Sequence, residues 1–85
     1  MLNFAVNLQH EHIEVRVKRD GDVVEGRTFV TGSRPDRMLA AGEWLLARGC
    51  PDTTVTSLMT GSLKRRAWVE CDVDPQLSEW ASSAD

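Results

Sequence analysis

The sequence has few cysteines, no long apolar run and little net charge, and each shortage excludes a class of protein. The two cysteines, Cys50 and Cys71, are too few for a disulfide framework, and their spacing to the histidines does not fit a zinc site. No apolar run approaches the ~20 residues that span a membrane, and no apolar leader begins the chain, so we expect an intracellular protein with reduced thiols. A formal net charge of −3 is too small to identify a nucleic-acid binder or a mimic of DNA.

The motifs of common catalytic sites are also absent. The chain has no P-loop, no GxGxxG and no CxxC, and no nucleophile stands at a defined spacing from a histidine. His10 and His12 flank Glu11 and would need a third strong ligand to hold a metal, so we expect a solvated turn there. A domain of this size rarely encloses a substrate pocket, and the sequence therefore predicts no enzyme, no metal and no cofactor.

The chain has the composition of one small folded domain. Its 85 residues are 41% hydrophobic and 27% charged, which is ordinary for a globular domain and argues against wholesale disorder. We expect residues 1–85 to form a single α+β domain. Its predicted outer parts are an extra N-terminal edge strand at 3–8, a short turn of helix at 76–80 and a flexible tail at 81–85.

Segment 33–50 is the only one that is long enough for a helix and also carries a helical apolar repeat. Ser33 and Asp36 have the spacing of a capping box, but the proline after Arg34 favours Arg34 as N-cap, so both remain candidates. Gly49 predicts a left-handed stop. The stripe expected to face a sheet consists of Met38, Leu39, Ala41, Gly42, Leu45, Leu46 and Gly49.

The clearest strand pattern lies at residues 13–18, where apolar and charged residues alternate strictly. Asp20-Gly21 follows directly and predicts a type I′ hairpin turn, since the central residues of that turn need positive φ angles. The return strand is expected at about 23–30, with a bulge where Gly26 interrupts the alternation.

The chain after the helix predicts two further strands. Residues 52–58 are rich in threonine and β-branched side chains, residues 60–62 are turn formers, and residues 63–71 alternate between two faces. The predicted order is therefore ββαββ, a two-layer α+β sandwich with an antiparallel sheet of about four strands and one helix packed on one face. We expect the function to lie on the other face, which this arrangement leaves open to solvent.

Side chains typical of binding sites fall on that expected open face. Trp68 is the strongest candidate, because alternation places it opposite Ala67 and Val69, and Trp and Arg are enriched at binding hot spots. The alternative is that Trp80 or the N-terminal segment folds over it, while Trp44 beside the helix stripe is expected in the core or at its boundary. The expected partner-binding residues are Trp68, Arg66, Lys64, Arg65, Glu70, Arg16 and Lys18.

The charged residues of this set have more than one interpretation. The basic side chains could form a surface that binds nucleic acid or an acidic patch on a protein. Alternatively, they form a solvated face on which Glu14 and Glu70 neutralise their positive charge across neighbouring strands. The C-terminal part after the basic run is purely acidic and offers a third option, the imitation of DNA phosphates against a lysine-rich site.

The first hairpin carries a family resemblance in its strand and turn residues. The matching positions are Glu14, Val15, Val17, Arg19, Asp20, Gly21, Val24, Gly26 and Arg27. They resemble the corresponding hairpin of one small type I-F anti-CRISPR family, whose members are phage and mobile-element proteins that disable a bacterial Cascade surveillance complex. Further matching positions are Gly32, Ser33 and Pro35, and then Gly49 and Pro51. With these positions the resemblance covers about half of the chain. The basic run and Trp68 depart from the family pattern.

The resemblance implies an inhibitor that binds a Cascade subunit, often the large subunit near its PAM-reading surface, and blocks recruitment of target DNA. Its partner would be a protein in the cytoplasm of the bacterial host, and neither nucleic acid nor a membrane is the expected partner. The alternative is a small nucleic-acid-binding or regulatory module that uses the basic strand and Trp68 as a stacking platform. A free sheet edge leaves both a monomer and a homodimer open.

Overall fold

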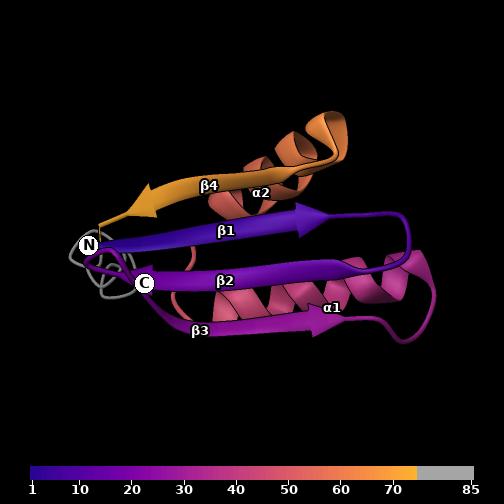
Figure 1. The fold of residues 1–85 in the computed structure, drawn as a ribbon, viewed down its shortest axis with the longest axis horizontal. Helices are drawn as coiled ribbons and strands as arrows, with labels where there is room; N and C mark the ends of the chain where they lie inside the picture. The colour runs from indigo at the N-terminus through magenta and orange to yellow at the C-terminus, as the bar shows by residue number, and fades with distance from the viewer. Residues whose placement is uncertain (75–85) are drawn as a thin grey trace.

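The computed structural model describes residues 1–74 (Figure 1). Three strands come first, two helices follow, and one further strand completes the described part. The predicted order ββαββ with a single helix is therefore wrong, and the helical turn and tail expected at 76–80 and 81–85 lie outside the described residues. The elements are β1 (Leu2–Leu8), β2 (Ile13–Arg19), β3 (Asp22–Phe29), α1 (Arg34–Ala47), α2 (Asp52–Arg65) and β4 (Trp68–Val73).

The strands form one antiparallel sheet in the order β3-β2-β1-β4. β1 pairs with β2 along its whole length and with β4 from Leu2 to Asn7, so the N-terminal strand is central and not the edge strand that was predicted. Its second partner comes from the far end of the described chain, and no local pattern reveals such a partner. Phe4 and Val6 of β1 are fully buried, as expected for a central strand.

The hairpin of β2 and β3 confirms the prediction made for it. Asp20 (φ 51°) and Gly21 (φ 88°) both have the positive φ angles that the Asp-Gly sequence indicated. The position of the bulge was predicted wrongly, because Gly26 pairs regularly with β2 while Val24 has no partner in the register. The extra residue explains why two adjacent valines interrupt the alternation of β3.

α1 begins where the capping box indicated. The Asp36 N–H donates to the Ser33 hydroxyl at 3.3 Å, and the Asp36 carboxylate accepts from the Ser33 N–H at 3.2 Å, so Ser33 is the N-cap. Gly49 has a φ of 94° just after the helix, as predicted.

The buried stripe of α1 is narrower than expected and consists of Ala41, Trp44 and Leu45. Trp44 is only 7% exposed, which confirms its place in the core. Leu39 and Leu46 were expected in the stripe but are 64% and 44% exposed. Since α1 has the sheet on one side and α2 on another, its remaining surface stays in solvent.

α2 occupies a region that was predicted as strand, turn and strand, and this prediction was wrong. Val55, Leu58, Met59 and Ser62 have the i, i+3, i+4, i+7 spacing of a helix, and they form its inner side. Strand propensity of threonine is a weak preference that burial overrides. The Thr56 hydroxyl instead donates to the carbonyl of the residue four positions earlier, at 3.2 Å.

Ser62 is fully buried and joins α2 to the sheet. β4 begins at Trp68, which lies opposite Asn7. The next residue of β1, Leu8, therefore has no partner on β4. The Ser62 hydroxyl accepts from the Leu8 N–H at 2.7 Å and donates to the Ala67 carbonyl at 2.8 Å. The residues just before β4 are thereby held at the end of the helix, which is why the last strand is shorter than predicted.

Both helices lie on the same side of the sheet, with α1 against β2 and β3 and α2 against β1 and β4 (Figure 1). The described residues thus form a two-layer α+β domain with a four-stranded antiparallel sheet, as predicted in outline. None of the helices within residues 1–74 has the length and apolar character needed to cross a membrane. The core between the layers is Phe4, Val6, Leu8, Ile13, Val15, Val17, Ala41, Trp44, Leu45, Cys50, Val55, Leu58 and Val73.

Candidate functional site

The face of the sheet opposite the helices, which we call the open face, brings together four of the predicted site residues. In the register, Trp68 pairs with Asn7, while Arg16 and Glu70 both pair with Ala5. Lys18 lies one pair further along the same face. Because side chains alternate along a strand, all of these residues point away from the core.

The centre of the open face is a stack between Arg16 of β2 and Trp68 of β4. The Arg16 guanidinium carbon lies 4.2 Å from the centroid of the Trp68 ring. The small side chain of Ala5 on the strand between them lets Arg16 reach across, and Ala5 is only 1% exposed under the stack. Trp68 is 37% exposed, so a partner has access to it, and Trp80, the alternative cover, lies outside the described residues. Such a contact contributes about 0.5–1 kcal/mol at an exposed site.

A second arginine–tryptophan stack lies on the side of the sheet that the helices cover, and among the described residues its arginine, unlike Arg16, has an ion-pair partner. The Arg48 guanidinium lies 3.8 Å from the Trp44 centroid and also forms an ion pair with Glu25 of β3. The hydrogen bond from Arg48 lowers the pKa of the Glu25 carboxyl. Within residues 1–74, by contrast, the Arg16 side chain has no hydrogen bond or ion pair, and its Nε is buried without a partner. The open-face stack therefore keeps its charge available for a binding partner.

The expected balance of charges across the strands is not found on this face. Glu14 pairs with His12 at 3.1 Å and not with Arg16. Among the described residues, Glu70 and Lys18 have neither an ion pair nor a side-chain hydrogen bond. Asp72 accepts a hydrogen bond from Asn3 at 3.0 Å. The open face therefore carries basic side chains near its centre and carboxylates along β4.

The basic run lies elsewhere, and its predicted place on a strand was wrong. Lys64 and Arg65 are in the last turn of α2, where positive charge is favourable beside the helix C-terminus. Arg66 is the C-cap in the left-handed conformation, with a φ of 55°. The structure therefore separates these three residues from the open face.

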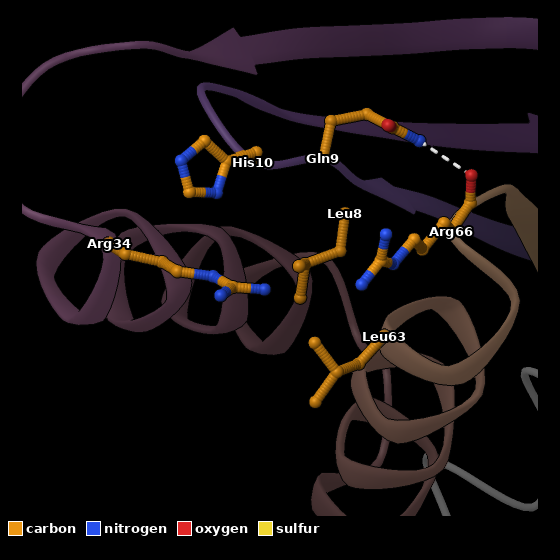
Figure 2. A pocket seen from close by; sticks show the side chains of 6 residues that line it. All are labelled: Leu8, Gln9, His10, Arg34, Leu63 and Arg66. Carbon is orange, nitrogen blue, oxygen red and sulfur yellow. Dashed lines mark hydrogen bonds between the residues drawn. The ribbon is translucent and has the colours of Figure 1, made fainter.

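Arg66 instead lines a pocket at the end of the molecule where β1 turns into β2 (Figure 2). The pocket has a volume of about 460 Å³, and we call it the end pocket. No local sequence pattern indicates this pocket, because three distant segments supply its lining and only the topology brings them together. The lining residues are Leu8, Gln9, His10, Arg34, Leu63 and Arg66.

An apolar hollow lies between the outer sides of the two helices. It has a volume of about 570 Å³ and includes Leu39 and Leu63, which are 64% and 45% exposed. Exposed apolar side chains of this kind are normal on the surface of a folded domain.

The cysteines and histidines do not form a reactive centre in the described part of the chain. Burial, with a contribution from nearby Cys71, raises the pKa of the Cys50 thiol to about 12, and both thiols are free. His10 lines the end pocket while His12 contacts Glu14. Within residues 1–74 no group of three or more potential ligands is arranged to hold a metal.

Comparison with protein-family models, with curated proteins and with solved structures found no match to this chain. The function is therefore inferred from the surfaces of the molecule itself.

Proposed function

We propose that this protein is a phage or mobile-element anti-CRISPR that binds a type I Cascade complex through its open face and blocks recruitment of target DNA. The stack of Arg16 on Trp68 carries the proposal. Arginine and tryptophan are the side chains most typical of binding hot spots, and here each restrains the other before a partner arrives. Restraint of this kind reduces the entropy that binding must overcome.

The first hairpin supports the choice of partner. The segment that resembles the anti-CRISPR family forms β2, the turn and β3, and it contributes Arg16 and Lys18 to the open face. Arg16 and Lys18 are not themselves among the matching positions, so the resemblance supports the hairpin as a scaffold for the surface and does not assign its side chains. In this proposal the protein works in the bacterial cytoplasm, by binding and without catalysis.

The charge distribution on the open face supports the mode of inhibition. A surface that recruits DNA must carry lysine and arginine side chains. Glu70 and Asp72 along β4 would meet such side chains, while the Arg16–Trp68 stack anchors the contact. The inhibitor would then occupy the surface that target DNA needs.

The test is a competition between the protein and target DNA for a purified type I-F complex. We expect co-purification with the complex and loss of target-DNA binding at saturating inhibitor. The double variant Arg16→Ala/Trp68→Ala should weaken inhibition at least tenfold, whereas Leu39→Ala on the far side of the molecule should stay within twofold of the wild type. Unchanged DNA binding at saturating protein, for the type I-F and a type I-E complex alike, would overturn the proposal.

A second candidate is a small nucleic-acid-binding module, and the same stack favours it. A partly exposed indole beside an unpaired guanidinium is a platform on which a base can stack. This function predicts an affinity for single strands that falls steeply with salt. A gel shift without binding at low salt would eliminate it.

A further inference from the structure

We infer that the end pocket is a binding site for a phosphate group carried by a nucleotide. Two arginines and a histidine line it, and none of the aspartates and glutamates within residues 1–74 does (Figure 2). The pocket belongs to neither face of the sheet, so the inference is independent of the proposed inhibitor function.

The unpaired state of the two arginines is the first argument. Within residues 1–74, the side chains of Arg34 and Arg66 make no hydrogen bond and no ion pair. Figure 2 shows Arg34 extending from the start of α1 and Arg66 from the end of α2 toward the same space beside Leu8. Two guanidinium groups that share a pocket repel each other until an anion neutralises them. A phosphate satisfies both, because guanidinium groups bind its oxygens in a bidentate manner.

The walls of the pocket are held in place by other residues. Arg37 donates to the carbonyl of His10 at 3.0 Å and to that of Gly32 at 2.6 Å, which fixes the β1–β2 turn against the loop before α1. Gln9 donates to the Arg66 carbonyl at 2.9 Å, which fixes the same turn against the end of α2. The site is therefore arranged before a ligand binds, and Arg34 and Arg66 are free to contact it.

The remaining lining indicates what the phosphate is attached to. Figure 2 shows Leu8 between the two arginines and Leu63 below them, which gives the pocket an apolar wall, while the planar imidazole of His10 lies above Arg34. A volume of about 460 Å³ is in the range of small-molecule sites and exceeds what one phosphate ion needs. A phosphate with an attached sugar and base fits both the charge and the apolar wall. Its source is either a free nucleotide or one unit of a nucleic-acid strand.

The test is an NMR titration of the ¹⁵N-labelled full chain with inorganic phosphate, with AMP and with a ten-nucleotide oligothymidine. We expect saturable shifts of the His10, Arg34 and Arg66 amides, with AMP binding at least tenfold more tightly than inorganic phosphate. A further tenfold gain for the oligonucleotide would identify a strand as the source, and equal affinity would identify a free nucleotide.

Matched variants separate a site from general attraction of anions. Arg34→Gln with Arg66→Asn should weaken AMP binding at least tenfold, and asparagine is chosen because it tolerates the left-handed backbone of Arg66. Arg19→Gln removes one positive charge from an exposed arginine at the opposite end of the sheet and should change affinity less than twofold. Equal losses in both variants, or no shift of the pocket amides with any of the three ligands, would overturn the inference. Each variant is used only if its amide spectrum retains the dispersion of the wild type; should the double variant fail this, Arg34→Gln alone is compared with Arg19→Gln.

Discussion

The two faces of the sheet come from the same four strands but have opposite roles. On the covered face Phe4, Val6 and Ile13 are all completely buried beneath the helices. On the open face the side chains are mainly polar, and within residues 1–74 the aromatic contact there is the stack of Arg16 on Trp68. The contacts that stabilise the fold are therefore concentrated on the covered face. Side chains on the open face can be substituted, and can serve binding, without loss of the fold. The following predictions test this separation.

The largest effect is expected from Leu45→Ala on the covered side. Leu45 is fully buried in the core, and truncation of such a residue costs about 2–5 kcal/mol. Since a domain of this size has only about 3–5 kcal/mol of net stability, the variant should be largely unfolded at 25 °C. Urea denaturation followed by circular dichroism measures the change. Leu39→Ala on the same helix is the control and should stay within about 0.5 kcal/mol of the wild type. Similar losses in both would contradict the burial described.

Ser62→Ala should have the next largest effect, because it leaves the buried N–H of Leu8 without an acceptor. The expected loss of unfolding free energy is about 1–3 kcal/mol. Ser57→Ala, at an exposed position of α2, is the matched control and should be neutral or slightly stabilising, since alanine favours helices. Hydrogen exchange of the Leu8 amide should also become faster in Ser62→Ala only. An unchanged exchange rate would refute the role given to Ser62.

Alkaline pH should weaken the covered side through Cys50. Its pKa is raised to about 12 in the folded protein, whereas an unfolded cysteine titrates near 8.5. The folded state thus keeps a proton that the unfolded state loses, and the stability from this group, complete below about pH 8.5, declines as the pH rises toward 12. The slope approaches about 1.4 kcal/mol per pH unit. Urea midpoints at pH 8 to 11 measure it, and Cys50→Ala should remove this part of the decline. An equally steep decline of the unfolding free energy in Cys50→Ala would show that groups other than Cys50 cause the decline.

The smallest effect on stability is expected on the open face. A double-mutant cycle with Arg16→Met and Trp68→Leu should give a coupling of about 0.5–1 kcal/mol. Each single variant should remain folded and cooperative, because the core does not include either side chain. A coupling above about 2 kcal/mol would mean that the stack belongs to the stable framework and would break the distinction between the faces.

The two helices show where sequence-based prediction succeeded and where it failed. α1 was predicted because residues next to its two ends indicate where it begins and ends, namely the capping box at Ser33 and the left-handed Gly49. α2 begins after Pro51 without a side-chain cap, and its threonines resemble a strand. The spacing of Val55, Leu58 and Ser62 contained the helical signal, but the composition of the segment outweighed it in the prediction.

The candidate sites followed the same rule. Arg16, Lys18, Trp68 and Glu70 were predicted together because alternation in a strand is a local property, and the structure places them on one face. The end pocket depends on the meeting of a turn and two helix ends, and that meeting is decided by the order of strands in the sheet. The position of β1 between β2 and β4 was therefore the information that the sequence did not supply.

The pairing of the first strand with the last described one has a consequence for synthesis on the ribosome. Leu2 pairs with Val73, so one side of β1 has no partner until nearly all of the described chain has been translated. During that interval a nascent chain exposes unpaired backbone groups beside an apolar strand, which is the kind of edge that promotes aggregation. The arrival of β4 ends this exposure. Chains that stop after α2 should therefore depend on chaperones far more than chains that include Val73.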